Sequence, residues 1–155
     1  MRMMRIRKVL KGKVLFVGIG NEMRGDDSAG PRFVKKGKNR LKNCLFLNAK
    51  ETPENYLEKI LEKNPDTLIF VDAVDFCSEP GDYKIFSKEE ITNFSLSTHN
   101  SSLKLSIDYL KFYKNEIKIY LLGFQPKSCK INEGITSEVD NSISNLIKKL
   151  KYKFK

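Results

Sequence analysis

The stretch KVLFVGIGNEMRGDDSAGP spans residues 13–31 and begins with an apolar run that ends in glycine. Short apolar runs closed by glycine are typical of buried β-strands, so we expect a strand over Lys13–Gly20. The segment SAGPRFVKK, residues 28–36, predicts the start of a helix, because Pro31 suits a first helical turn. We expect Gly37 to end or weaken this helix. A strand, a loop and a helix in this order form the first unit of an α/β fold.

Apolar segments of strand length recur along the chain and alternate with segments of helical spacing. Further strands are expected over Cys44–Ala49, Thr67–Phe76, residues 83–87 and Glu116–Phe124. Further helices are expected after an N-cap at Thr52, over Ser102–Tyr113, and from an N-cap at Ser137 to Leu150, while Ser87 is expected to cap a turn that ends near Asn93.

Alternating strands and helices predict an α/β fold. We expect a single-domain three-layer sandwich, with a mostly parallel twisted sheet of about five strands and helices on both faces. The length of 155 residues suits one domain. No stretch approaches the roughly 20 apolar residues of a membrane span.

The chain is basic, with a formal net charge of +10, but its lysines are dispersed. Net charge alone indicates non-specific association, so we expect no nucleic-acid partner. The three cysteines, Cys44, Cys77 and Cys129, are odd in number and widely spaced. This pattern favours free thiols in a reducing compartment, and therefore a cytoplasmic protein. We expect Cys77 to be buried, because free cysteine packs as a small hydrophobic side chain.

The loop after the first strand does not fit a dinucleotide-binding turn. Gly18 and Gly20 are in place, but the third glycine of GxGxxG is displaced to Gly25. Asp26 and Asp27 follow immediately and would repel a pyrophosphate. A nucleotide-binding domain therefore ranks third, behind two other functions that are described below.

Acidic residues and the single histidine follow three segments that end at one edge of the predicted sheet. Asp26 and Asp27 follow the first strand, Asp72 and Asp75 lie at the end of the third, and His99 follows the next strand-like segment. Ligands of such sheets bind beyond the carboxyl ends of the strands. Two carboxylates and one imidazole suit Zn²⁺ or Ni²⁺. Each residue also has a structural reading: helix capping by Asp26 or Asp27, a turn at Asp72, and a packed or surface position for His99.

Five segments, in this order and spacing, resemble the hydrogenase maturation endopeptidases, which process the large subunit of [NiFe]-hydrogenases. They are GIGNEMRGDDSAGP, TPEN, IFVDAVDF followed by PGDYKIF, STHNSSL, and LLGFQP, and the resemblance runs from about Val14 to Leu150. It is closest to the branch that serves the formate-hydrogenlyase type of hydrogenase. The expected division is a basic N-terminal extension over residues 1–12 and a protease domain over residues 13–155.

The resemblance implies a site and a cation. It places the metal ligands on Asp27, Asp72 and His99, a choice that the residues alone leave open between Asp27 and Asp26 and between Asp72 and Asp75. The cation would be Ni²⁺ supplied by the precursor, with Zn²⁺ or Cd²⁺ as substitutes. The complete expected set comprises catalytic Asp27, Asp72 and Asp75, and substrate-binding Gly20, Asn21, Asn100 and Gln125.

The resemblance also implies a reaction, the removal of a short C-terminal peptide from the nickel-loaded large-subunit precursor by a monomeric enzyme. Water would be activated either by a carboxylate such as Asp75 or by the metal. The alternative is a non-catalytic, nickel-dependent chaperone for the same precursor. One departure lies before TPEN, where residues 48–51 read NAKE and relatives often carry small residues.

Overall fold

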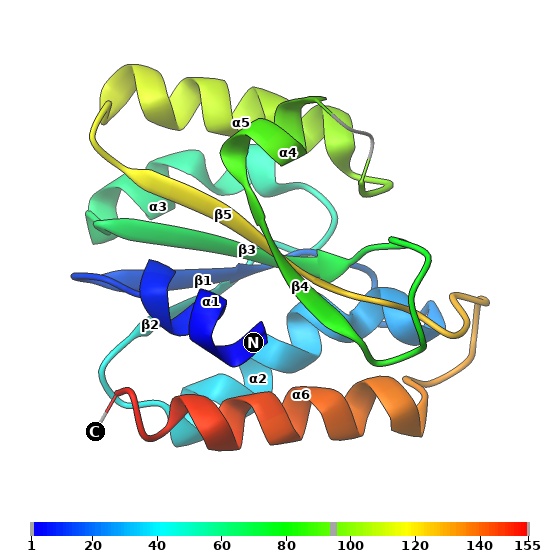
Figure 1. The fold of residues 1–155 in the computed structure, drawn as a ribbon. Helices are drawn as coiled ribbons and strands as arrows, with labels where there is room; N and C mark the ends of the chain where they lie inside the picture. Colours follow the sequence, from blue (N-terminus) through cyan, green and yellow to red (C-terminus); the bar gives the residue numbers. More distant parts are fainter. Residues whose placement is uncertain (1, 94–95, 155) are drawn as a thin grey trace.

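The computed structural model describes residues 2–93 and 96–154, which form one five-stranded sheet between two layers of helices (Figure 1). The strand order is β2-β1-β3-β5-β4, in which β4 is antiparallel to β5 and the other pairs are parallel. The strands are β1 (Val14–Gly18), β2 (Leu45–Asn48), β3 (Thr67–Ala73), β4 (Tyr83–Ser87) and β5 (Lys118–Phe124). The predicted α/β sandwich with a mostly parallel sheet is confirmed.

Within residues 2–93 and 96–154, three α-helices cover each face of the sheet. One face carries α1 (Arg2–Val9), α2 (Ala29–Arg40) and α6 (Ser137–Leu150). The other face carries α3 (Leu57–Lys63), α4 (Lys88–Asn93) and α5 (Asn100–Tyr113). Two short 3₁₀ helices, η1 (Gly25–Ser28) and η2 (Pro53–Tyr56), precede α2 and α3.

The central strands are apolar throughout because both of their faces are covered. In β1, Val14 and Phe16 belong to the core beneath α2 and α6, whereas Leu15 and Val17 belong to the core beneath α3 and α5. This division follows from the two-residue period of a strand. All four side chains have no exposed surface, so the apolar run that opens the domain anchors both cores.

Residues 1–12, expected as a basic extension, include the amphipathic helix α1. Ile6 and Leu10 from this segment are only 2% and 3% exposed, and they join the core that contains α2 and α6. Burial of two such side chains is worth about 1.5–3 kcal/mol each. The segment therefore contributes to the packed structure.

Gly37 was expected to end or weaken the first long helix, and the prediction that the helix ends there was wrong. Helix α2 continues through Gly37 to Arg40. A Cβ atom at Gly37 would lie 2.3 Å from a ring carbon of Phe46 in β2. The glycine therefore allows close packing of the helix on the sheet, and this contact offsets its low helix propensity.

The predicted caps have different outcomes. Ser87 is confirmed as a cap, because its Oγ accepts a hydrogen bond from the Glu90 amide at 3.2 Å and the Glu90 side chain accepts one from the Ser87 amide at 3.2 Å. Thr52 occupies the predicted cap position, with Pro53 as the first residue of η2, although its side chain makes no capping hydrogen bond. The Ser137 cap was wrong by one residue: α6 begins at Ser137, and the cap position belongs to Thr136.

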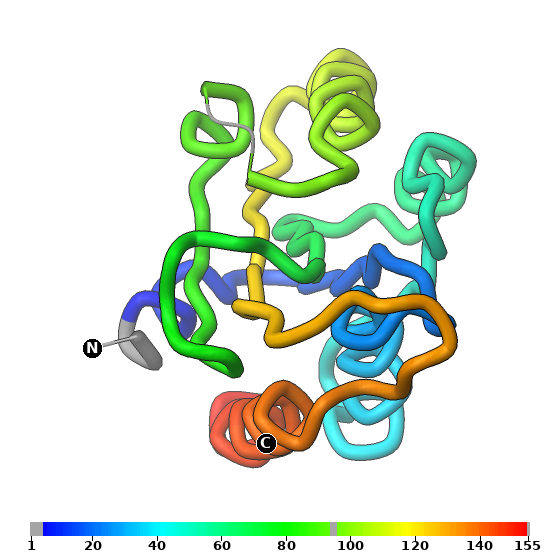
Figure 2. The backbone as a smooth tube through the Cα atoms, turned by 90° about the vertical axis from the view of Figure 1, so that its right-hand side faces the viewer, coloured from blue at the N-terminus to red at the C-terminus, as the bar shows by residue number. Residues whose placement is uncertain are grey.

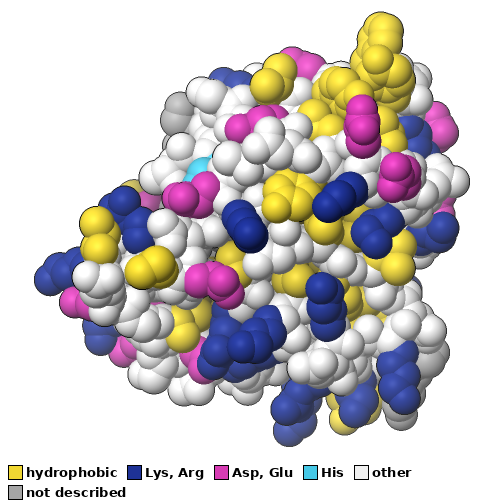
Figure 3. Space-filling model, turned by 180° about the vertical axis from the view of Figure 1, so that it is seen from behind, with side chains coloured by type: hydrophobic (Ala, Val, Ile, Leu, Met, Phe, Trp, Pro, Cys, Tyr) yellow, Lys and Arg dark blue, Asp and Glu magenta, His cyan; other side chains and the backbone are white. Residues whose placement is uncertain are grey.

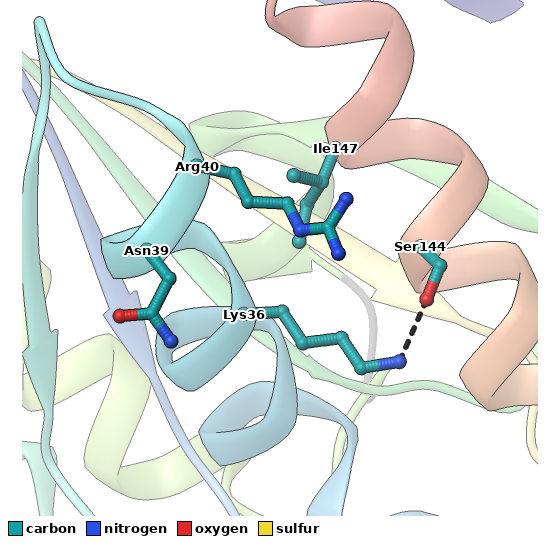
Figure 4. Close-up of a pocket in the computed structure, with 5 residues that line it drawn as sticks. All are labelled: Lys36, Asn39, Arg40, Ser144 and Ile147. Atoms are coloured by element: carbon teal, nitrogen blue, oxygen red, sulfur yellow. Dashed lines mark hydrogen bonds between the residues drawn. The ribbon is translucent and has the colours of Figure 1, made fainter.

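Helices α2 and α6 are joined by polar contacts at their exposed margin. Lys36 donates hydrogen bonds to Asp140 and to Ser144, both at 2.6 Å (Figure 4 shows the second). A cavity of about 240 Å³ opens between the two helices and is lined by Lys36, Asn39, Arg40, Ser144 and Ile147. The α2 residues of this lining come from the C-terminal half of the helix, away from Asp27, and the other two belong to α6. Among the described helices, none is long and apolar enough to cross a membrane.

Candidate active site

The strand order changes direction between β1 and β3, which is the topological switch point of the sheet. From β1 the chain passes through α2 to β2 on one side, and then through α3 to β3 on the other side of β1. Ligands of α/β sheets bind beyond the strand ends at such a switch point. Figure 2 faces this edge, where the loops after β1, β2 and β3 and the loop before α5 gather.

The loop from β1 to η1 depends on glycine at position 20. Gly20 has a φ of +144°, and a Cβ atom there would lie 1.8 Å from the carbonyl oxygen of Asp27. The Gly20 amide donates a hydrogen bond to the Lys50 carbonyl at 2.8 Å. The loop after β1 is thereby attached to the loop after β2.

Asp27 lies in this loop with its carboxylate turned back toward the end of β1. Its Oδ2 accepts a hydrogen bond from the Asn21 amide at 2.9 Å. The side-chain oxygen of Asn21 in turn accepts one from the Met23 amide at 2.8 Å. Asp27 remains partly exposed, so its carboxylate is held in place and accessible to a ligand.

Asp26 has a different role, because it is fully buried. Its carboxylate accepts hydrogen bonds from the amides of Lys127 at 2.8 Å, Ser128 at 3.1 Å and Thr136 at 2.7 Å, and from the Thr136 hydroxyl at 2.9 Å. These bonds join η1 to the segment between β5 and α6. The structure thus separates the two adjacent aspartates into a buried anchor, Asp26, and an accessible carboxylate, Asp27.

Asp72 and His99 form a hydrogen-bonded pair at the end of β3. The Asp72 carboxylate has no exposed surface, and its Oδ2 lies 3.0 Å from His99 Nδ1. Ser97 Oγ also donates to Oδ2, and the Ala73 amide donates to Oδ1 at 2.8 Å. Burial raises the pKa of Asp72, while the hydrogen bond from His99 opposes this shift. The hydrogen bond to Asp72 raises the pKa of His99.

Three side chains offer ligand atoms within 4.8 Å of one another: Asp27, Glu51 and His99. Asp72 contacts this group through His99. Figure 3 shows the histidine of the chain partly visible among acidic side chains. An imidazole with carboxylates suits Zn²⁺ or Ni²⁺, so the donor chemistry fits a divalent cation. The structure brings together Asp27, Asp72 and His99 as expected; their ligation of a metal stays a prediction.

Asp75 lies in the loop between β3 and β4, and Gln125 follows the last residue of β5. Gln125 donates a hydrogen bond to Asp75 at 3.1 Å and accepts one from the Phe76 amide at 2.9 Å. The Cys77 amide also donates to Asp75, and these bonds lower the pKa of the exposed Asp75 carboxylate. Cys77 itself is exposed, so its predicted burial was wrong. The catalytic role of Asp75 and the substrate role of Gln125 stay predictions.

The other expected substrate-binding residues border the same region. Gly20 and Asn21 line a groove of about 260 Å³ whose other lining residues are Glu22, Met23, Pro31, Asn48, Lys50 and Glu51. Asn100 is the first residue of α5, and its amide donates to the Ser97 carbonyl at 3.1 Å. These positions are compatible with peptide binding, which stays a prediction.

Sequence reasoning missed Glu51 and Ser97. Glu51 follows β2, whose carboxyl end lies at the same sheet edge as those of β1 and β3, so its position was a signal that could have been used. Ser97 lies two residues before His99, inside the STHN segment. Its bond to Asp72 has no sequence signature, because it depends on the approach of two loops.

Comparisons with known proteins agree with this fold. The sequence model of the HycI hydrogenase maturation protease family matches residues 32–152. The Hydrogenase 3 maturation protease of Escherichia coli is 32% identical over 134 residues, which cover 85% of each chain. The crystal structure of a [NiFe] hydrogenase maturation protease HycI from Thermococcus kodakarensis superposes with a TM-score of 0.85, at 30% identity over 96% of this chain and 97% of the other.

The solution structure of an endopeptidase HycI from Escherichia coli gives a TM-score of 0.78 at 26% identity, over 91% of this chain and 90% of the other. Its fold and those of the other relatives agree with the predicted architecture. The matched segment, the identity and the shared fold together show that the chain is a peptidase that belongs to the hydrogenase maturation protease family.

Proposed function

We propose that this protein is the endopeptidase that removes a short C-terminal peptide from the nickel-loaded precursor of a [NiFe]-hydrogenase large subunit. Its membership of the hydrogenase maturation protease family supports this reaction. The observation that carries the proposal is the grouping at the sheet switch point: Asp27 and His99 lie within reach of one cation, and Asp72 is bonded to His99.

Nickel is part of the substrate in this proposal, and Asp27, Asp72 and His99 recognise it. When the Nδ1–H group of His99 donates a hydrogen bond to Asp72, Nε2 is left as the nitrogen that can bind a cation. Zn²⁺ or Cd²⁺ would substitute, since both accept imidazole and carboxylate donors. Recognition of the metal would restrict cleavage to loaded precursor.

The remaining residues of the site bind the peptide and activate the attacking water. Gly20 and Asn21 at the groove, together with Asn100 and Gln125, bind the peptide backbone near the scissile bond. Asp75 acts as the general base that accepts a proton from the attacking water. Like any aspartate whose pKa is not raised, Asp75 is ionised at neutral pH, which is the form that accepts a proton. The three free cysteines are consistent with a cytoplasmic place for this reaction, and the enzyme would act as a monomer.

The test is incubation of the protein with nickel-loaded precursor, read by mass spectrometry of the large subunit. We expect a mass loss that corresponds to a C-terminal peptide, and no loss with nickel-free precursor. The variants Asp27→Ala and His99→Ala should release no peptide. A wild-type protein that binds loaded precursor and releases nothing would instead support the alternative, a nickel-dependent chaperone.

A further inference from the structure

Glu51 is held at the candidate site by backbone hydrogen bonds of the two residues that precede it. The Ala49 amide donates to the Gly18 carbonyl at 2.9 Å, and the Gly20 amide donates to the Lys50 carbonyl at 2.8 Å. Lys50 has a φ of +52°, which turns the chain after β2. These bonds hold the exposed Glu51 against the end of β1, where Asp27 also lies.

The Glu51 carboxylate can bind a cation more readily than the Asp72 carboxylate can. Both oxygens of Asp72 already accept hydrogen bonds from the chain, Oδ1 from Ala73 and Oδ2 from Ser97 and His99. Within residues 2–93 and 96–154, no hydrogen bond or ion pair engages the Glu51 carboxylate. One of its oxygens nevertheless lies within 4.8 Å of ligand atoms of both Asp27 and His99.

Two carboxylates in so small a space repel each other, and a cation between them removes that repulsion. His99 adds a nitrogen donor, and its bond to Asp72 fixes the orientation of the ring. The resulting donor set contains two carboxylates and one imidazole, and both kinds of donor bind Zn²⁺.

We propose that Glu51 is a further metal-binding residue, so that Asp27, Glu51 and His99 face the cation while Asp72 holds His99. With this added carboxylate the protein binds Ni²⁺ or Zn²⁺ on its own, before any precursor is present. The inference rests on the proposed function only in taking the nickel of the precursor as the cation bound during processing. Residues 48–51, which read NAKE, thereby acquire a role in metal affinity.

The test is calorimetric titration of the purified protein with NiCl₂, for the wild type, Glu51→Gln and Glu22→Gln. Glu22 is a matched control, because it lines the same groove and is exposed but lies outside the three-residue group. We expect Glu51→Gln to weaken nickel binding by at least about tenfold. Glu22→Gln should change it by less than about twofold, since salt screens exposed charges. Thermal denaturation followed by circular dichroism verifies that both variants are folded.

Equal nickel affinity of Glu51→Gln and Glu22→Gln would overturn the role of Glu51, as would a wild-type protein that binds no nickel. The processing assay separates this inference from the proposed function. If nickel binding depends on Glu51 but the wild type releases no peptide from loaded precursor, the metal-binding role stands and the protease proposal fails. If processing proceeds and nickel affinity does not depend on Glu51, only the role of Glu51 fails.

Discussion

His99 Nδ1 lies 3.0 Å from Asp72 Oδ2, and this contact joins the end of a buried strand to the start of α5, 27 residues later in the chain. The carboxylate is fully buried, whereas the histidine side chain keeps 11% of its surface exposed. An imidazole that is fixed by a buried carboxylate and remains partly exposed has the arrangement of a metal ligand with a positioning partner. Asp72 can therefore be tested separately from the residues that face the cation.

Asp72→Asn should lower the affinity of the protein for Ni²⁺ by about 10–100-fold, because the loss of an outer partner of a metal-binding histidine has an effect of that size. Asparagine has nearly the same shape, so the fold should persist. Asp108→Asn, an exposed change on α5, is the control. An Asp72→Asn protein with the affinity of the wild type would show that the carboxylate does not assist His99.

Asp75→Asn should slow precursor processing by about 10²–10⁴-fold, the usual contribution of a general base. Nickel affinity should stay unchanged, because Asp75 lies outside the group formed by Asp27, Glu51 and His99. Asparagine keeps an oxygen that can accept the bonds from Cys77 and Gln125. Single-turnover rates and calorimetric titration measure the two effects, and an unchanged rate would remove Asp75 from the mechanism.

Gly20→Ala should destabilise the protein by at least about 2 kcal/mol, since the new Cβ atom meets the Asp27 carbonyl and the backbone conformation disfavours alanine. Gly134→Ala is the matched control, because no atom lies within 4 Å of its added Cβ. Urea denaturation measures both free energies of unfolding. Equal stabilities would mean that the loop after β1 relaxes without cost.

The carboxylate of Asp140 should stabilise the fold in a pH-dependent way. The hydrogen bond from Arg32, with support from Lys36, lowers its pKa in the folded protein. The stabilisation is therefore present above the unfolded-state value of about 3.9 and is lost as the pH falls through the lower folded-state value. Asp140→Asn should cost about 0.5–1 kcal/mol at pH 7, because solvent screens this partly exposed pair. Denaturation at pH 7 and pH 2 should show the difference shrinking, whereas a constant difference would contradict the prediction.

The cysteines should react in a defined order. Burial raises the pKa of the Cys44 thiol to about 12 and also raises the pKa of Cys129, whereas Cys77 is exposed. The thiolate is the reactive form, so iodoacetamide at pH 8 should label Cys77 first and Cys44 slowly. Peptide mass spectrometry at successive times gives the order. Fast labelling of Cys44 in folded protein would show that its environment opens.

The sheet was predictable because its signal is local. Val14 to Val17 are apolar without alternation, which indicates a strand covered on both faces, and the structure places these side chains in two cores. Gly37 shows the limit of local signals. The low helix propensity of glycine argues against a helix at Gly37, but the Phe46 ring, nine residues later in β2, leaves no room for a side chain there.

The site was predictable in outline, because strand ends at one edge of a sheet must converge. The pairing of His99 with Asp72 rather than with another carboxylate was not, since it depends on how the loop before α5 returns to the sheet. The burial of Asp26 and the partial exposure of Asp27 were also not predictable, because adjacent residues in a 3₁₀ turn point in different directions. Only the loop that packs on Asp26 shows which carboxylate is buried.

The bonds from Asp26 to Thr136 join positions 110 residues apart. During synthesis on the ribosome, β1 and η1 emerge well before the amides that hold Asp26, because the Thr136 amide is translated 110 residues later. The loop that carries Asp27 consequently obtains its anchor only when this later segment has been made. A nascent chain cannot bind metal with a finished site until the segment before α6 has left the exit tunnel.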